Sequence, residues 1–310
     1  MKKQSKSQQP LVSVIMPVYN AEDFLVPALE SILSQTYKNF ALIVVNDAST
    51  DNSLKILKKY QKQYPKKITI INVEQNLNAG GDSCANLALK VARGTYIARM
   101  DADDISYPTR LEKQVAFLEK NKDIFLVGSN ADVIDGSGAI IGEKLEPLSP
   151  EEIYKSYMTF HPLIHPSCMF RRLLNGKPFA YQIKYSANND YYTFFKTLCS
   201  GQKYTNLEER LIQYRIHGNN DTFVHMKNKF MNTLRIRLSM CIKHGYRPTI
   251  KDIAMSITQS LVLFTMPEAA ITNLYLVTKG IKKPSEIVLP LLGQIKSALI
   301  YPYRVATHLL

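Results

Sequence analysis

Tryptophan is absent from this chain of 310 residues, and cysteine is scarce. The four cysteines form no Cys-x-x-Cys pair and lie in no histidine-rich segment, so they do not indicate a zinc site or a disulfide framework. We expect them to be buried thiols of a protein from a reducing compartment. They are Cys84, Cys168, Cys199 and Cys241.

Long apolar runs are also absent. No stretch of about 18 uninterrupted apolar residues occurs, which argues against a conventional transmembrane helix. The first ten residues, MKKQSKSQQP, are basic, and no apolar segment precedes the first strand-like run, so a secretory signal is not expected. We predict that residues 1–10 form a flexible basic N-terminus. We also predict a cytoplasmic protein, with peripheral attachment to the inner face of the plasma membrane as a variant of that location.

Acidic residues are rare in the last part of the chain. Residues 223–310 contain twelve Lys or Arg and three Asp or Glu, and so carry +9 of the overall +13. Their pattern is helical and is interrupted near Pro267, Pro284 and Pro290. Basic helices with an apolar stripe can lie on an anionic membrane surface or pack as a cap on the preceding domain, and both alternatives stay open. Nucleic acid is not an expected partner, because no recognition motif accompanies the charge.

Strand-like apolar runs alternate with helical patterns in the first third of the chain. The strand-like runs cover residues 11–20, 40–47, 68–73 and 94–100, and the helical patterns cover residues 24–33, 49–64 and 83–92. This alternation predicts an α/β fold with a mostly parallel central sheet flanked by helices. Further on, residues 124–141 are typical of a strand, a turn and a second strand.

Carboxylates follow two of the predicted strands. Asp47 ends the run VVND, and Asp101, Asp103 and Asp104 lie in MDADD directly after residues 94–100. Ligands of open α/β sheets bind beyond the carboxyl ends of the strands, so these groups are expected to share one crevice. A D-x-D suits Mg²⁺ or Mn²⁺ that also holds phosphate oxygens. An isolated D-x-D is more often a solvated acidic loop, so the surrounding sequence decides between the two interpretations.

The surrounding blocks resemble a known family. The segment VSVIMPVYNAEDFLVPALESILSQTYKNFALIVVNDASTDNS, followed by NLNAGG and GTYIARMDADD, is similar in order and spacing to inverting family-two glycosyltransferases with the GT-A fold. The resemblance implies a Rossmann-like GT-A domain over residues 11–222, with a nucleotide-sugar-binding half (11–105), an acceptor-side half (106–222) and a basic helical extension (223–310). It also implies transfer of a sugar, usually from a UDP-sugar, to a saccharide or lipid-linked acceptor in cell-surface polysaccharide or glycolipid synthesis.

The resemblance assigns roles to residues on the donor side. It implies that Asp47 reads the uracil ring, and that the remaining donor contacts come from the first nucleotide-binding loop and from the block CAN. Those residues are Pro17, Tyr19, Asn20 and Asn86. Taken from the residues alone, Asp47 could instead cap a turn with Ser49 and Thr50, and Tyr19 could pack in the core.

The resemblance also implies a divalent cation. Asp103 would bind Mn²⁺ or Mg²⁺ directly and Asp101 would support it, whereas Asp104 is the member that we expect to matter least. The block YRIHGNN matches a family segment in which His217 would ligate the metal or touch the diphosphate, and Arg215 would anchor a closing loop. A structural role for His217 is the alternative.

On the acceptor side, SANNDYYTFF corresponds to the family segment that holds the general base, which assigns that role to Asp190. This chain has Asn189 where glutamate is common, and losing that negative charge should lower the pKa of Asp190. The alternative is that Asp190 only caps the helix. In HPLIHPSCMFRR, the resemblance implies that His165 and Ser167 line the acceptor pocket, while the following Met169 and Phe170 belong to the core.

One departure from the family affects the donor site. Many relatives have an arginine that helps to hold phosphate where this chain has Ala85, so the positive charge would come from Arg99 or from Arg171 and Arg172. The departures keep a second hypothesis open, a catalytically inactive GT-A module that binds nucleotide-sugar. A phosphate enzyme with an aspartyl nucleophile is less compatible, because its D-x-D usually follows the first strand rather than the fourth.

Overall fold

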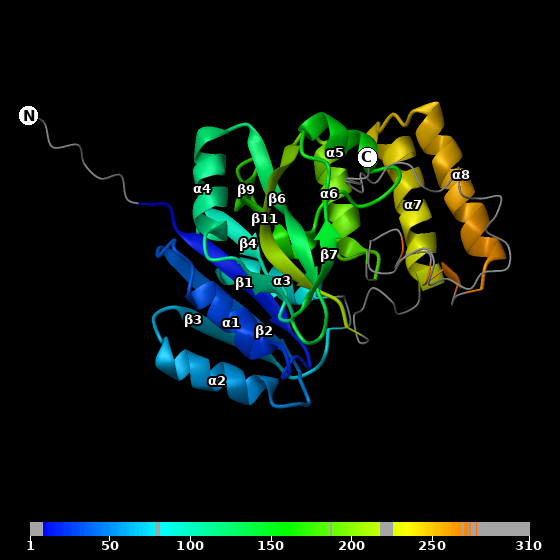
Figure 1. Cartoon of the computed structure of the whole chain (residues 1–310). Coiled ribbons are helices and arrows are strands. Elements are labelled where there is room, and N and C mark those ends of the chain that lie inside the picture. Colours follow the sequence, from blue (N-terminus) through cyan, green and yellow to red (C-terminus); the bar gives the residue numbers. More distant parts are fainter. Residues whose placement is uncertain are drawn as a thin grey trace, which may run out of the picture.

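The computed structural model describes residues 9–77, 81–186, 188–217 and 226–267, together with residues 270, 271, 273 and 277. A mixed, mostly parallel sheet runs through these residues, with helices on both faces (Figure 1). Its strand order is β3-β2-β1-β4-β8-β6-β11-β5, and β7 pairs with β6. The α/β fold class predicted from the alternating pattern is therefore confirmed.

Four parallel strands form the first half of the sheet, as the sequence predicts. They are β1 (Val12–Val18), β2 (Phe40–Asp47), β3 (Ile68–Val73) and β4 (Tyr96–Arg99), and the helices between them are α1 (Leu25–Leu33), α2 (Ser53–Gln63) and α3 (Asp82–Val91). The chain passes from β1 outwards to β2 and β3, then returns to place β4 on the other side of β1. The sheet therefore has a topological switch point between β1 and β4, where such sheets open a crevice for ligands.

The second half of the sheet mixes directions. Its strands are β5 (Ile105–Ser106), β6 (Ile124–Ile134), β7 (Ile140–Lys144), β8 (Met169–Arg171) and β11 (Lys203–Arg215). The short strands β9 (Leu173–Leu174) and β10 (Lys177–Pro178) form a separate ladder. β6 and β7 are antiparallel, which confirms the predicted strand, turn and strand. The helices here are α4 (Arg110–Lys120), α5 (Pro150–Ser156), the 3₁₀ turn η1 (His165–Ser167) and α6 (Asn189–Cys199).

Two hydrophobic clusters cover the two faces of the sheet. On β1, Val14 and Met16 face the cluster under α1, α2 and α4, whereas Ile15 faces the cluster under α3, α5 and α6. Alternate side chains of a strand point to opposite faces, so burial on both sides requires the continuous apolar run seen in the sequence. Met169 and Phe170 are fully buried in β8, as predicted. All four cysteines are free thiols, two of them buried and two partly buried.

Of two further helices, α7 (Met226–His244) lies beside α6, and α8 (Ile250–Thr265) lies on the outer side of α7 (Figure 1). Ile236 and Met240 of α7 are buried in the cluster that contains α6. Arg237 is also buried and donates to the carbonyl of Thr159 (2.6 Å) and to the hydroxyl of Tyr191 (3.3 Å). The inner face of α7 is thus part of the folded domain. In the part of the chain that the structure describes, no helix combines the length and apolarity needed to cross a membrane.

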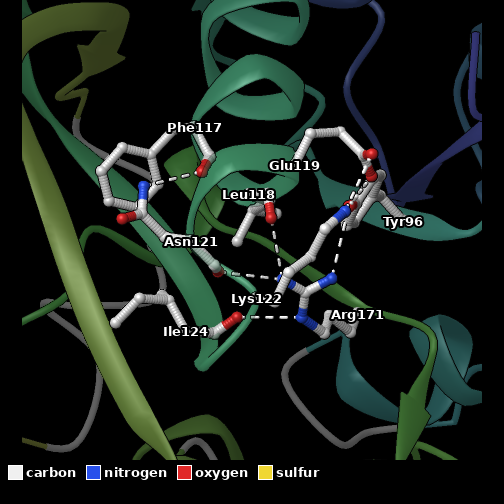
Figure 2. A network of polar contacts seen from close by, with 8 residues as sticks. All are labelled: Tyr96, Phe117, Leu118, Glu119, Asn121, Lys122, Ile124 and Arg171. Atoms are coloured by element: carbon white, nitrogen blue, oxygen red, sulfur yellow. Dashed lines mark hydrogen bonds and ion pairs between the residues drawn. The ribbon is translucent and has the colours of Figure 1, made fainter.

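Arg171 joins the end of α4 to β8 (Figure 2). Its guanidinium donates to the carbonyls of Leu118 (2.9 Å), Asn121 (3.0 Å) and Ile124 (3.0 Å), and to the hydroxyl of Tyr96 (3.3 Å). Basic side chains often satisfy the last carbonyls of a helix in this way, because those groups have no partner within the helix.

The position of Arg171 corrects one expectation. Arg171 pairs with Tyr96, the first residue of β4, whereas the MDADD segment follows the last one. At about 3.3 Å per residue, the ends of β4 are about 10 Å apart. Arg172 lies at the same remote end and donates to the carbonyl of Gly94 (2.9 Å). The expectation that Arg171 and Arg172 supply charge to the donor site is therefore wrong.

We expect Arg171→Met to lower the free energy of unfolding by about 2 kcal/mol, because it leaves partly buried carbonyls without their donor. Urea denaturation followed by circular dichroism measures the change. Lys122→Met is the matched control from the same network, since Lys122 forms only an exposed pair with Glu119 and should change little. An equal effect of the two substitutions would contradict the role given to Arg171.

Candidate functional site

The loops that follow β1 and β2 are hydrogen-bonded to each other. The backbone N–H of Asn20 donates to Ser49 Oγ (3.1 Å), and the N–H of Thr50 donates to Asn20 Oδ1 (2.8 Å). Asn20 and Ala48 both have a left-handed backbone, with φ of 45° and 54°. This conformation is tolerated by asparagine but costs alanine about 1 kcal/mol, a type of strain that concentrates at functional sites.

Asp47 ends β2 beside these loops and is buried. Its Oδ1 accepts a hydrogen bond from the N–H of Leu77 (2.9 Å), and its carbonyl accepts one from the side chain of Asn76 (3.2 Å). Ser49 and Thr50 bond to Asn20 instead, so these contacts do not support a turn-capping role for Asp47. Asp47 therefore lies at the rim between the two loops and the segment that follows β3.

Pro17 and Tyr19 frame the same rim. Pro17 is in β1, in register with Val45 of β2. Tyr19 follows β1 and is 53% exposed, so the alternative in which it packs in the core is wrong. Its aromatic face is accessible for stacking.

Beyond the end of β4, Asp101 forms an ion pair with Arg99. The distance from Asp101 Oδ1 to Arg99 Nη2 is 2.7 Å. Arg99 is only 3% exposed, and its Nε and Nη1 are buried without a hydrogen-bond partner among the described residues. Burial would lower the pKa of Arg99, but the surrounding acidic groups raise it, with Asp101 the largest contributor. A full positive charge is therefore enclosed at the end of this strand.

Asp103 meets the end of β11. Its Oδ2 is 3.1 Å from Nε2 of His217, and its carbonyl accepts from Nε of Arg215 (2.7 Å). The rings of His217 and Phe24 are 4.7 Å apart, and the guanidinium of Arg215 lies 4.8 Å above the same Phe24 ring. The structure thus brings together the D-x-D segment and the YRIH block, which are more than a hundred residues apart in the sequence.

Asp104, expected to matter least, has a structural contact that the sequence did not indicate. It is 1% exposed, and its Oδ1 accepts from the backbone N–H of Arg215 (2.8 Å). Burial, followed by the negative charge of Asp103, raises the pKa of Asp104 well above its usual value. The Asp104 carboxyl holds the end of β11 against the D-x-D segment.

Asp103, His217 and Asp101 offer ligands that suit a divalent cation. Carboxylate oxygens suit Mg²⁺ and Mn²⁺, and an imidazole nitrogen adds a preference for a transition metal such as Mn²⁺. Within the described ranges, no three such side chains already converge as a metal cluster. A site that shares its cation with substrate phosphates needs only one or two protein ligands, so these residues fit the cation.

Asp190 lies in the first turn of α6, in the part of the chain that is expected to form the acceptor side. Its Oδ1 accepts from the N–H of Tyr191 (2.7 Å), and its Oδ2 lies 3.5 Å from His161 Nε2 and 3.6 Å from His165 Nδ1. Burial alone would raise the pKa of Asp190, but His161, followed by His165 and the Tyr191 amide, outweighs it and lowers the pKa. The pKa of Asp190 is thus lowered, the direction that the sequence predicts, but the contacts that lower it are those with the two histidines and the Tyr191 amide.

Asn189 itself supports the loop before α6. It is fully buried, and its Oδ1 accepts from the backbone N–H groups of Lys184 (2.8 Å) and Tyr185 (2.7 Å). The helix cap, Asn188, makes no side-chain capping bond. The alternative role of Asp190, capping the helix, is therefore not supported. Its contact with the helix backbone is the hydrogen bond from the amide of the next residue, Tyr191.

His161 and His165 have different surroundings. Burial and the nearby charge of Arg99 lower the pKa of His165 to about 3, so His165 is neutral at ordinary pH, and its Nε2 is 2.8 Å from the hydroxyl of Tyr181. His161 was missed by the sequence reasoning. The available signal was its position four residues before His165 in the segment HPLIHP.

Two predicted ligand contacts do not fit the structure. Ser167 is fully buried; its Oγ donates to the carbonyl of Ile164 (2.7 Å) and accepts from the N–H of Ser129 (3.1 Å). Asn86 exchanges two hydrogen bonds of 2.8 Å with the backbone of Tyr181. Both side chains are thus committed to the protein backbone, and Asn86 joins α3 to the acceptor-side segment.

Asp82 is a further residue that sequence reasoning missed. It begins α3, is 4% exposed, and its Oδ1 has no hydrogen-bond partner among the described residues. Burial, followed by the charge of Asp190, raises the pKa of Asp82 well above its usual value. A Cβ added to the preceding Gly81 would lie 3.3 Å from Nη2 of Arg99. Arg99 therefore sits among Asp82, Asp101 and Asp190, between the donor and acceptor sides.

Comparison with known proteins gives several relatives. The chain is 38% identical over 224 residues to the uncharacterized glycosyltransferase MJ1057 of Methanocaldococcus jannaschii, covering 71% of this chain and 76% of that protein. It is 32% identical over 226 residues to the UDP-Glc:alpha-D-GlcNAc-diphosphoundecaprenol beta-1,3-glucosyltransferase WfaP of Escherichia coli, covering 73% and 83%.

Solved structures share the fold. TarS of S. aureus in complex with UDP superposes with a TM-score of 0.60 at 18% identity, covering 83% of this chain and 73% of that one. The mannosyltransferase PcManGT of Pyrobaculum calidifontis, in complex with GDP-Man and Mn²⁺, gives a TM-score of 0.56 at 16% identity and covers 90% and 82%. The predicted GT-A fold is thus confirmed.

The family model described as glycosyl transferase family 2 matches residues 13–177, which include β1 to β4, the D-x-D segment and His165. The matched residues are more than half of the chain, and they contain the switch point between β1 and β4. This protein belongs to glycosyltransferase family 2.

Proposed function

We propose that this protein is an active inverting hexosyltransferase that transfers a sugar from a UDP-sugar to a hydroxyl of a saccharide or a lipid-linked acceptor. The observation that carries the proposal is that Asp101, which follows β4, and Asp190, in the first turn of α6, both lie close to the buried Arg99. The proposed setting is synthesis of cell-surface polysaccharide or glycolipid at the cytoplasmic side of the membrane. The name of the relative WfaP, which gives that protein a diphosphoundecaprenol-linked acceptor, supports the lipid-linked alternative.

The donor would lie across the carboxyl ends of β1, β2 and β4. Asp47 would accept a hydrogen bond from the uracil ring, while Asn20 and the exposed Tyr19 border the nucleoside. Support comes from TarS, which was solved with UDP and with UDP-GlcNAc. Asn86 would act indirectly by holding the Tyr181 segment.

Asp103 and His217 would hold Mn²⁺ or Mg²⁺, with Asp101 in support. A cation held there neutralises charge on the departing nucleoside diphosphate. Arg215 and Asp104 keep the His217 segment against the D-x-D segment. The Mn²⁺ in the PcManGT structure supports this choice of metal.

Asp190 would remove the proton from the acceptor hydroxyl. As that oxygen forms a bond to the anomeric carbon, the bond to the diphosphate breaks, UDP leaves with the electron pair, and the proton moves to Asp190. The lowered pKa of Asp190 keeps the base ionised, and His161 and His165 lie close to its Oδ2.

Arg99 would supply the positive charge that Ala85 does not. Arg171 and Arg172 are bound at the far end of β4, whereas Arg99 already holds Asp101. We assign Arg99 a positioning role, because its free nitrogens are buried and it acts through the carboxylates around it.

Asp190→Asn and Asp103→Ala should each lower UDP release from the correct UDP-sugar by about 100-fold or more, because one removes the proton acceptor and the other a metal ligand. Coupled detection of UDP with Mn²⁺ and a panel of acceptors measures the rates. Asp123→Asn, an exposed carboxylate remote from the site, is the control. Equal rates in all variants, with donor binding confirmed by calorimetry, would favour the alternative of a binding module without turnover.

His161→Phe should move the acidic limb of kcat/KM to higher pH by about one unit. The base must be ionised, so activity falls below its pKa; His161 lowers that pKa, and its removal raises it. Phenylalanine keeps the ring contacts with Tyr157 and Tyr191. His244→Phe, at the end of α7, is the control, and an unshifted limb in His161→Phe would contradict the role of His161.

Arg99→Met should lower kcat by about 100-fold, with a smaller change in KM for the donor. The reason is that Asp82, Asp101 and Asp190 lose the positive charge that they share. Arg99→Lys should recover part of kcat by restoring the charge without the planar fork. Steady-state kinetics and thermal unfolding are measured together, with the exposed Arg93→Met as control. No recovery in a folded Arg99→Lys, or full kcat in Arg99→Met, would contradict a positioning role.

A further inference from the structure

The outer face of α8 is apolar. Five large apolar side chains on this helix are between 45% and 88% exposed, and their spacing of three, four, four and three residues places them in one stripe. They are Ile250, Ile253, Ile257, Leu261 and Phe264. A contiguous exposed apolar surface of this kind usually marks an interaction site.

The polar side of α8 faces the protein. Ser256 is buried and its Oγ donates to the carbonyl of Met158 (3.1 Å). Gln259 accepts from Arg237 of α7 (2.9 Å) and donates to the carbonyl of Thr159 (3.1 Å). The helix is therefore oriented opposite to an ordinary surface helix, with its hydrogen-bonding residues inward and its apolar stripe outward.

Cations accompany the apolar stripe. On α7, Leu238 and Ile242 are 61% and 71% exposed. Four basic residues on these helices and the loop between them are also exposed: Arg235, Lys243, Arg247 and Lys251. The one acidic residue in the range 226–267 is Asp252, whose carboxylate accepts from the N–H and hydroxyl of Thr249 at the start of α8. Apolar side chains among unopposed cations match the chemistry of an anionic bilayer surface.

We propose that the outer faces of α7 and α8 form a docking surface for an anionic lipid membrane, on which the helices lie without crossing it. The surface is distinct from the donor crevice; its benefit to catalysis rests on the proposed function, because a lipid-linked acceptor would be held there. Figure 1 shows α8 as the outer helix on the side that carries α6, which contains Asp190. Docking thus brings the acceptor side, rather than the nucleotide side, toward the bilayer.

Charge distinguishes this occupant from a second copy of the chain. A symmetric dimer through these faces would bring two sets of exposed cations together, with Asp252 of each copy already engaged in a cap. Anionic lipid headgroups would instead attract these cations, because their charges are opposite.

The test is sedimentation of the full chain with vesicles of phosphatidylcholine alone or mixed with phosphatidylglycerol, at low and high salt. We expect binding to the anionic vesicles that weakens with salt. The variant with Ile257→Asp and Leu261→Asp should need at least tenfold more lipid for half-saturation. A variant with Lys243→Gln, Arg247→Gln and Lys251→Gln should bind more weakly and with less salt dependence. Val91→Asp, an exposed apolar position on α3, is the control.

Three results would overturn the docking surface. The first is no binding of the folded protein to anionic vesicles at low salt. The second is a concentration-dependent dimer that the Ile257→Asp and Leu261→Asp variant abolishes, which would assign the face to a second copy. The third is a large drop in the melting temperature of that variant, which would show that the chain covers this face itself. UDP release on a water-soluble acceptor is measured in parallel, so that loss of docking and loss of activity are separated.

Discussion

The parallel pairing of β1 with β2 on one side and β4 on the other is the constraint on which the site depends. It directs the ends of all three strands to one edge, so Asn20, Asp47 and Asp101 lie at that edge although the chain separates them by dozens of residues. β8 joins β4 in the opposite direction, which places Arg171 at the other edge. Whether a basic residue can serve the donor site is thus decided by strand direction and not by distance along the sequence.

At this edge of the sheet, the buried guanidinium of Arg99 lies among several carboxylates whose environments differ. Asp82 and Asp101 have raised pKa values, chiefly through burial, whereas the contacts of Asp190 with His161 and His165 lower its pKa. When neighbouring carboxyl groups have different pKa values because their environments differ, they can take different roles in one reaction. Arg99 limits the repulsion among them. Burial, together with the charge of Arg99, lowers the pKa of His165, so this histidine adds no positive charge beside Asp190 at ordinary pH.

The sequence predicted the strands, the switch-point edge and the residues that follow it, because burial on both faces and turn chemistry leave local patterns. It could not predict contacts between segments that are far apart in the sequence. Ser167 was expected to line a pocket, but its Oγ accepts a hydrogen bond from the N–H of Ser129 in β6. Asn86 was expected to contact the donor, but its side chain is bonded to the backbone of Tyr181. Asp82 was missed for the same reason, because only the folded chain brings it close to Asp190. His161 has a local signal in the segment HPLIHP, but its proximity to Asp190 depends on the fold.

For the C-terminal helices, prediction from the sequence has a different limit. The sequence shows an apolar stripe, but it does not show whether the stripe faces the domain or the solvent. The apolar stripe of α8 would be expected to face the domain, because burial of apolar area is the largest favourable term in folding. Here Gln259 and Ser256 on the inner side of α8 donate to the carbonyls of Thr159 and Met158, so turning the apolar stripe inward would break these hydrogen bonds. Local hydrogen bonding therefore fixes the orientation of α8, and the apolar face is left for a surface outside the domain.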